Sequence, residues 1–291
     1  MNVKTIAVIG AGTMGRGIAY ASAFGGYKTV LEDVSRAVLE NGVAWIRQSF
    51  DEGISRGKIE ASARDKALSL ISTATNVEDA IRDAELIIEA VPEELEMKRE
   101  IFSIFDKFAK AGAIFASNTS SLSITDFTNT SASRDRCVGM HFFNPVPKMK
   151  LIELVRTPHT SDETVATCRE VAERMGKEVV LANESPGFIT TRVNALIGNE
   201  AFNMLEAGVA TPEDIDKALK LGLNHPMGPF ELVDLVGLDV RLKILEYLHS
   251  TLGEKYKPNV LLRQYVKEGR LGRKSGRGVY DYSKQEAANK P

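Results

Sequence analysis

Residues 3–15 read VKTIAVIGAGTMG, and residues 28–33 read KTVLED. The apolar run VKTIAVI is typical of a strand that is buried on both faces of a sheet. A glycine-rich turn follows it, then a helix-length segment, and KTVLED predicts a second strand. A strand, a helix and a strand in this order form a βαβ unit, which predicts a Rossmann-like, doubly wound α/β sheet.

The turn GAGTMG, residues 10–15, has the G-x-G-x-x-G spacing of dinucleotide-binding proteins. Gly10 permits a tight turn, Gly12 lets backbone N–H groups approach a pyrophosphate, and Gly15 lets the helix pack closely on the strand. The start of the helix at Thr13 and Met14 adds N–H donors and the positive end of a helix dipole. We therefore expect a dinucleotide cofactor at this turn.

Asp33 ends the second strand, 18 residues after Gly15. A carboxylate in this place accepts hydrogen bonds from the ribose hydroxyls and repels a 2′-phosphate, so it predicts NAD rather than NADP. Arg36 is a nearby cation that would favour NADP instead. A glycine turn that binds nothing is a further alternative, which the combination of strand, helix and acid disfavours.

The rest of the chain divides into two parts. Up to ESPG at 184–187, helical segments alternate with apolar segments of strand length, which lie at 85–91, 113–118, 137–143, 150–156 and 177–183. Beyond it the pattern is helical until GVYDY at 278–282, which predicts a strand. Two domains are the usual outcome for 291 residues. We expect a Rossmann-like domain over 1–184 with a helical insertion, followed by a smaller, mainly helical domain over 185–291.

Composition and charge exclude several classes of protein. A net charge of −2 gives no basic groove for nucleic acid, and no apolar run approaches the roughly 20 residues of a membrane-spanning helix. Cys137 and Cys168 have no metal-site spacing, and two cysteines fit a reducing compartment. The first residues already read as a core strand. We therefore expect a cytoplasmic protein with no metal, no nucleic-acid partner and no membrane partner.

Polar residues follow several of the expected strands. Glu93 and Ser120 come shortly after two of them, and His141 and Asn144 lie in HFFNPVP, where a third one ends. Doubly wound sheets bind ligands at the carboxyl ends of their strands, so these loops are expected to meet at one edge. A solvated loop residue is the alternative for each of them taken alone.

Glu153 lies in the strand segment KLIELVR, twelve residues after His141. Strand alternation places it on the polar face, away from Ile152 and Leu154. A strand that returns beside HFF would set this carboxylate against the imidazole, which gives a base with an orienting partner. A histidine beside two phenylalanines is also typical of a packed core residue, and the spacing alone leaves both interpretations open.

Several motifs together resemble the L-3-hydroxyacyl-CoA dehydrogenase family, in particular its stand-alone bacterial 3-hydroxybutyryl-CoA dehydrogenase type. They are GAGTMG, the strand end at Asp33, SNTSSLSI (117–124), HFFNPVPKMKLIEL (141–154), PGF (186–188), GLNHPMGPFELVDLVGLD (222–239) and LGRKSGRGVYDY (271–282). The most specific part is HFFNPVP followed by K-x-x-E-L. The resemblance implies reversible, NAD-dependent oxidation of a short-chain (S)-3-hydroxyacyl-CoA to the 3-ketoacyl-CoA.

The resemblance also implies roles for individual residues. It makes His141 and Glu153 the catalytic dyad, in which His141 takes the hydroxyl proton as hydride leaves for the nicotinamide. It places Ser120 and Asn144 at the reacting oxygen and the nicotinamide, as catalytic and cofactor-binding residues. These residues are the ones that the strand ends had already indicated.

Further contacts are implied by the resemblance alone. Cofactor contacts fall on Glu93, Lys98 and Lys274. A helical hairpin over roughly residues 35–60 clamps the CoA part of the substrate in this family, and its basic residues Arg47, Arg56 and Lys58 are the candidate contacts. The C-terminal helical domain forms the family's dimer, so we expect a homodimer.

Thr191 is a departure from the family pattern. The chain reads PGFITTR, where the family commonly has PGFIVNR with an asparagine that helps to hold the substrate. A hydroxyl has one donor hydrogen and a carboxamide has two. Either Thr191 still contacts the substrate, directly or through a water, or it bonds locally to the helix backbone.

Two other functions remain open from the sequence. One is a related sugar-acid dehydrogenase of the gulonate dehydrogenase and lambda-crystallin kind, and the other is a non-catalytic dinucleotide-binding protein. The intact HFFNPVP and the basic hairpin favour an acyl-CoA substrate. The presence of both His141 and Glu153 disfavours a protein without catalysis.

Overall fold

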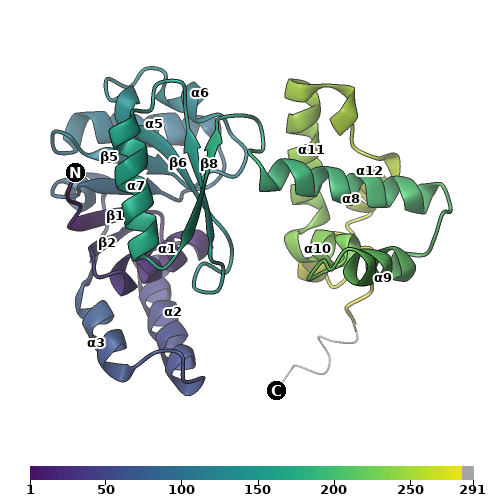
Figure 1. Cartoon of the computed structure of the whole chain (residues 1–291), viewed down its shortest axis with the longest axis horizontal. Helices are drawn as coiled ribbons and strands as arrows, with labels where there is room; N and C mark the ends of the chain where they lie inside the picture. Colours follow the sequence, from purple (N-terminus) through teal and green to yellow (C-terminus); the bar gives the residue numbers. More distant parts are fainter. Residues whose placement is uncertain (284–291) are drawn as a thin grey trace. The chain divides into compact units, whose positions relative to one another are not determined.

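The computed structural model describes residues 1–283 and divides into two compact units, Met1–Phe188 and a second that begins at Ile189 (Figure 1). The sequence pattern places the boundary at 184/185. The structural division lies a few residues later because Phe188 is buried in the apolar core of the first unit.

The first unit is built on an eight-stranded sheet with the order β3-β2-β1-β4-β5-β6-β7-β8. Its first six strands are parallel and follow the order of a doubly wound dinucleotide-binding fold, as expected. The strands are β1 (Thr5–Ile9), β2 (Lys28–Glu32), β3 (Ile71–Ala74), β4 (Leu86–Glu89), β5 (Ile114–Ser117), β6 (Cys137–Phe142), β7 (Leu151–Arg156) and β8 (Glu178–Asn183).

The direction of β7 follows from the length of its connection to β6. Only residues 143–150 join the two strands, whereas a parallel crossover needs about a dozen residues or more. The chain therefore turns back, and β7 pairs antiparallel with β6. In this register His141 lies directly opposite Glu153.

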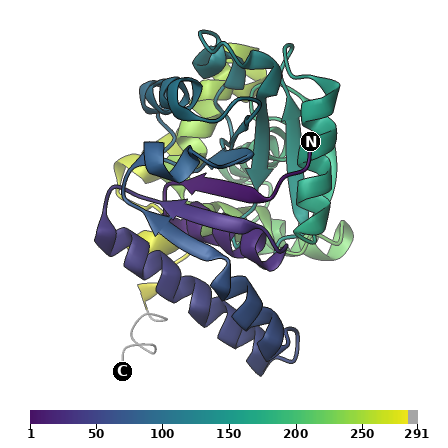
Figure 2. The same ribbon diagram turned by 90° about the vertical axis from the view of Figure 1, so that its left-hand side faces the viewer.

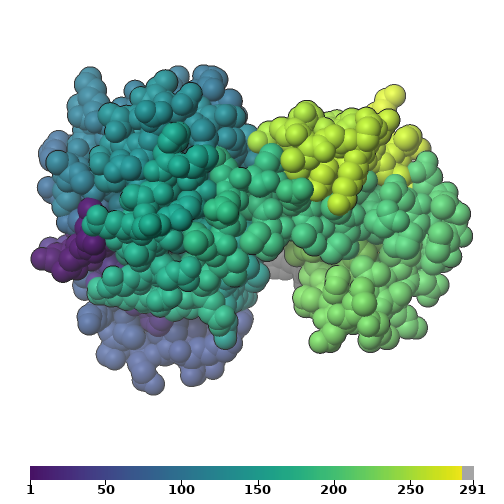
Figure 3. All heavy atoms as spheres, turned by 45° about the horizontal axis from the view of Figure 1, so that its top comes forward, coloured from purple at the N-terminus to yellow at the C-terminus, as the bar shows by residue number. Residues whose placement is uncertain are grey.

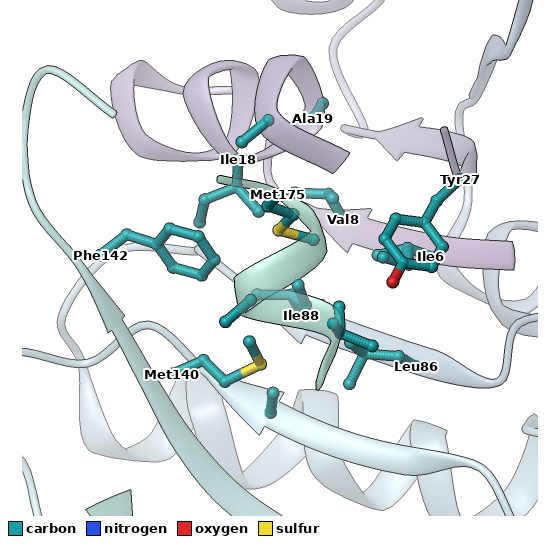
Figure 4. Packing of buried hydrophobic residues seen from close by; sticks show 14 of the residues in the cluster. Ile6, Val8, Ile18, Ala19, Tyr27, Leu86, Ile88, Met140, Phe142 and Met175 are labelled. Carbon is teal, nitrogen blue, oxygen red and sulfur yellow. The ribbon is translucent and has the colours of Figure 1, made fainter. Parts of the chain in front are cut away.

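Helices cover both faces of the sheet, and each face has its own apolar core (Figure 1). On one face, Ile18 and Met175 pack with the strand residues Ile88, Met140 and Phe142 (Figure 4). The helices of this face are α1 (Thr13–Phe24), α2 (Arg36–Ser55) and α7 (Asp162–Arg174). Those of the opposite face are α4 (Val77–Ile81), α5 (Leu95–Phe108) and α6 (Ile124–Thr128).

The expected helical hairpin consists of α2 and α3 (Ala61–Ser69), so its second helix lies beyond residue 60. Ser35 caps α2 by accepting a hydrogen bond from the N–H of Val38. The two helices lie side by side next to β3 at the edge of the sheet (Figure 2). In the space-filling view the hairpin forms a surface lobe of the first unit (Figure 3).

Two strand assignments differ from the sequence pattern. The sequence of β3 has no apolar run that would predict a strand, because its two central residues are exposed. GVYDY, expected to be a strand, forms only isolated bridges. The reason is that the carboxylate of Asp234 accepts the N–H groups of Val279 and Tyr280, so these donors are not available for a strand ladder.

The second unit is helical, and residues 189–283 contain no strand. Thr211 caps its second helix by accepting from the N–H of Asp214, and Pro212 occupies the first turn, as the sequence predicts. The helices are α8 (Thr190–Glu206), α9 (Pro212–Gly222), α10 (Pro229–Val236), α11 (Leu238–Leu252) and α12 (Val260–Lys267), and they enclose a core of their own.

Candidate active site

The glycine turn lies at the carboxyl ends of β1 and β2. Gly10 has a φ of +96°, which favours glycine, and a Cβ at Gly15 would lie 1.6 Å from the carbonyl oxygen of Gly10. At Gly12, by contrast, a Cβ would meet no atom within 4 Å. The protein therefore leaves open space above Gly12 where α1 begins, which fits a phosphate group approaching the N–H donors at Thr13 and Met14.

Asp33 fastens this turn to the end of β2. Its Oδ2 accepts from the N–H of Ala11 at 3.0 Å, and its Oδ1 accepts from the N–H of Ser35 at 2.9 Å. Beside it, Glu32 is buried, and burial together with the charge of Asp33 raises the pKa of the Glu32 carboxyl to about 7. The strand end thus carries two carboxyl groups, and the sequence pattern does not point to Glu32 because it lies within a buried strand.

Glu93 ties the loops after β4 and β5 together. Its Oε1 accepts from the hydroxyl of Thr119 at 2.6 Å and from the N–H of Ser120 at 3.0 Å. Burial alone would raise the pKa of the Glu93 carboxyl, but the charge of Lys98 and these hydrogen bonds lower it below its usual value. Glu93 is therefore a carboxylate at neutral pH, and it fixes the loop that carries Ser120.

Lys98 supports this arrangement from below. Its side chain is 1% exposed, and its Nζ lies 2.7 Å from Glu89 Oε1 and 3.2 Å from Glu93 Oε2. Ser117 also donates to Glu89, at 2.5 Å. A buried ammonium held by two carboxylates orients Glu93, and the expected contact of Lys98 with the cofactor stays a prediction.

The expected pair of His141 and Glu153 is present. Nδ1 of His141 lies 2.7 Å from Oε2 of Glu153, and the two residues are 5% and 0% exposed. The rings of Phe143 and Phe188 lie 4.5 and 5.9 Å from the imidazole, measured between ring centres. With an ionised glutamate, Nδ1 carries the proton and donates a hydrogen bond to Glu153, which leaves Nε2 as the basic nitrogen.

Asn144 begins the turn that follows β6, and its peptide bond to Pro145 is cis. The strand end before it is held by Asn118, whose Oδ1 accepts from the N–H of Phe142 at 2.9 Å. The N–H of Asn118 in turn donates to the carbonyl of Glu89. Asn118 thus links the carboxyl ends of three strands, and only its place at the end of AIFASN pointed to it in the sequence.

A basic cavity lies beside the hairpin. It has a volume of about 550 Å³ and is lined by Arg56 and Lys58 together with Lys148, Lys150 and Lys177. Arg47 is not part of it: this side chain lines a separate cavity of about 1010 Å³ between α2 and β3. The structure therefore brings two of the three candidate CoA contacts together and separates the third from them.

The two candidates of the second unit lie at different elements. Lys274 is exposed and pairs with Asp239, whose Oδ1 lies 2.6 Å from its Nζ. Thr191 is half-buried in the first turn of α8, and its hydroxyl makes no hydrogen bond to the described residues. The local backbone bond that was one alternative for Thr191 is therefore absent.

Residues 1–283 show neither a metal cluster nor a membrane-spanning helix. They contain no cluster of three or more His, Cys, Asp or Glu side chains that could hold a metal ion. Within the same residues, no helix has the length and apolar character needed to cross a membrane.

Comparisons with known proteins agree along the whole chain. The family model for the NAD-binding domain of 3-hydroxyacyl-CoA dehydrogenase matches residues 5–185, and that for the C-terminal domain matches residues 187–282. A probable 3-hydroxybutyryl-CoA dehydrogenase of Bacillus subtilis is 44% identical over 98% of this chain and 99% of its own length. The human mitochondrial hydroxyacyl-coenzyme A dehydrogenase is 40% identical over 96% of this chain and 91% of its own.

A solved structure shows the same fold. The (S)-3-hydroxybutyryl-CoA dehydrogenase of Ralstonia eutropha superposes with a TM-score of 0.93 and 42% identity, covering 97% of this chain and 99% of its own. Sequence and structure thus agree on the glycine turn, the acidic strand end and the second, helical domain. The chain belongs to the 3-hydroxyacyl-CoA dehydrogenase family and is an NAD-dependent oxidoreductase.

Proposed function

We propose that this enzyme oxidises the C3 hydroxyl of a short-chain (S)-3-hydroxyacyl-CoA, 3-hydroxybutyryl-CoA being the first choice, and that His141 is the base. The observation that carries the proposal is the 2.7 Å contact between His141 Nδ1 and Glu153 Oε2. It fixes the tautomer in which Nε2 accepts a proton. The names of the relatives from Bacillus and Ralstonia support the substrate.

NAD, when bound, supplies the hydride acceptor. The residues at hand fit this cofactor, because the space above Gly12 is open and Asp33 stands at the ribose end of the turn. His141 removes the hydroxyl proton as the hydride leaves C3, since hydride loss alone would produce a protonated ketone. Glu153 stabilises the imidazolium that results, which is the orienting role of a carboxylate in such dyads.

Ser120 and Asn144 complete the polar set in this proposal. Glu93 holds the Ser120 loop, and the turn after β6 carries Asn144. A hydroxyl and a carboxamide at these places would donate to the reacting oxygen as negative charge develops on it. In the reductive direction the protonated His141 is the acid. Lys274 is proposed to contact the cofactor, as the family resemblance implies.

The basic cavity is the proposed place for the phosphates of CoA. Arg56 and Lys58 lie on the hairpin side, and Lys148 and Lys150 lie on the opposite side. All four side chains are exposed, so they offer charge at little desolvation cost. Arg47 drops out of this proposal because it faces another cavity.

The homodimer and the cytoplasmic location are part of the same proposal. Exposed apolar side chains of the second unit support an interface there: Val193, Leu235, Val236 and Val240 are 52%, 49%, 40% and 38% exposed. Both cysteines are free and buried, which fits a reducing compartment.

The role of His141 can be tested in the reductive direction with acetoacetyl-CoA and NADH. His141→Gln should fold and bind NADH, while kcat should fall about 10²-fold or more because the proton donor is gone. Glu153→Gln should also lose rate, since the charge that stabilises the imidazolium is removed. Turnover within a few-fold of the parent in His141→Gln would show that this residue only packs in the core and is not the base. A parent that reduces a sugar-acid substrate instead would replace the proposed function.

Two variants of Asp33 distinguish its effect on the choice between NAD and NADP from its effect on the shape of the glycine turn. Asp33→Asn keeps an oxygen for the N–H of Ala11 but removes the charge, whereas Asp33→Ala removes both. We expect Asn to raise KM for NADH about tenfold and to raise the relative rate with NADPH, because the 2′-phosphate is no longer repelled. The gain should be modest while Glu32 remains. A parent enzyme that already prefers NADPH would contradict the assignment.

The CoA cavity can be tested with two arginines of the same hairpin. Arg56→Met should raise KM for acetoacetyl-CoA about tenfold, which corresponds to about 1.4 kcal/mol of lost binding. Arg47→Met is the matched control, because it removes the same charge from the other cavity. The effect of Arg56→Met should shrink at high salt. Equal effects of the two variants would mean that the hairpin acts only through its overall charge.

Thr191 is proposed to contact the substrate, since its hydroxyl has no partner among the described residues. Thr191→Val keeps the shape and loses the hydroxyl, so kcat/KM for acetoacetyl-CoA should fall about tenfold while Tm barely changes. Thr191→Ser keeps the hydroxyl and should retain most of the activity. Unchanged kinetics in Thr191→Val would assign this residue a structural role.

A further inference from the structure

Lys177 is a buried ammonium group with no role in the chemistry described so far. It directly precedes β8 and is 8% exposed. Its Nζ donates to two backbone carbonyls, 2.5 Å from the oxygen of Val146 and 2.8 Å from the oxygen of Met149. Burial lowers the pKa of this lysine, and no carboxylate is bonded to its Nζ among the described residues. The ammonium group therefore serves to hold two main-chain oxygens.

Those oxygens belong to the turn between β6 and β7. Within it, the N–H groups of Lys148 and Met149 both donate to the carbonyl of Pro145. On one side the turn is pressed against α1, because a Cβ at Gly17 would lie 2.9 Å from the Cβ of Val146. Lys177 therefore completes a set of contacts that leaves residues 144–149 little freedom.

The two ends of this turn serve different parts of the proposed site. Its first residue is Asn144, three residues after His141. Its later residues, from Pro147 to Met149, line the basic cavity proposed for the CoA phosphates. A shift of the turn would therefore move the carboxamide at the reacting end and the wall of the cavity together.

We propose that Lys177 is a positioning residue, which holds the 144–149 turn so that Asn144 and His141 stay aligned with the substrate. The proposal rests on the proposed function above. Lysine suits this task because one ammonium group has three donors and can bind two carbonyls that converge on it. An apolar side chain would leave the buried carbonyl of Val146 and the partly buried carbonyl of Met149 without this partner, and they would regain hydrogen bonds only by moving toward water.

The main alternative is that Lys177 binds a CoA phosphate, since it also lines the cavity. Its burial and its two carbonyl partners speak against this role, because the exposed Lys148 lies at the same cavity with a free path to solvent. The two roles differ in which substrates they affect. A phosphate ligand matters only for a substrate that carries the nucleotide, whereas a positioning residue matters for every substrate.

The test uses acetoacetyl-CoA and acetoacetyl-N-acetylcysteamine, a thioester that lacks the nucleotide and its phosphates. Lys177→Met should lower kcat about tenfold or more with both substrates, because small displacements at a reacting centre cost up to about 10²-fold in rate. Lys148→Met is the contrasting variant, and it should raise KM for acetoacetyl-CoA with a much smaller change in kcat. This split between kcat and KM separates a displaced turn from a lost phosphate contact.

Folding is checked by circular dichroism and by the binding of NADH. If Lys177→Met does not fold, Lys177→Gln keeps an uncharged NH2 group as a donor to the carbonyls and should give a smaller loss of kcat with both substrates. An unchanged kcat in a folded variant overturns the proposal, and so does a loss seen only with acetoacetyl-CoA. A parent enzyme that turns over neither thioester would instead refute the proposed function.

Discussion

The antiparallel return of β7 is the constraint on which the rest of the site depends. Because residues 143–150 are too few for a crossover, the chain reverses and pairs β7 with β6. That pairing alone sets Glu153 opposite His141, and side chains on directly opposed residues are close enough to bond. The same short connection forms the turn that carries Asn144, so the proposed base, its carboxylate partner and the carboxamide share one structural cause.

The sequence predicts features that depend on local geometry better than those that depend on distant partners. The sequence predicts the glycine turn and Asp33 because one βαβ unit sets their spacing. It predicts the place of Glu153 because strand alternation and the short connection set this residue beside His141. The hydrogen bonds of the Asn118 and Lys177 side chains cannot be predicted from the sequence, since they join segments that lie far apart in the chain. Arg47 and Arg56 line different cavities because nine residues are about two and a half turns of helix, which places the two side chains on opposite sides of α2. Their contact with CoA stays a prediction.

Buried charge at this edge of the sheet holds loops rather than strengthening the core. Lys98 lies between Glu89 and Glu93. Glu89 also accepts from Ser117, the last residue of β5, and Glu93 accepts from Thr119 in the loop that follows. Desolvating such groups is costly, and the cost is offset only when every partner is in place. A loop bonded in this way has one favoured position, which is what a hydride transfer between two aligned ligands requires.

Charge also distinguishes the two nucleotides that this enzyme handles. NAD and CoA both contain an adenosine and a pyrophosphate, but CoA carries a phosphate on its ribose and NAD does not. At the end of β2, the carboxylate of Asp33 would disfavour a phosphorylated ribose. At the hairpin cavity, which we propose for the phosphates of CoA, Arg56, Lys58 and Lys148 would favour one. The acidic end of β2 would thus select against a phosphorylated ribose, and the basic cavity would attract the phosphate groups of its ligand.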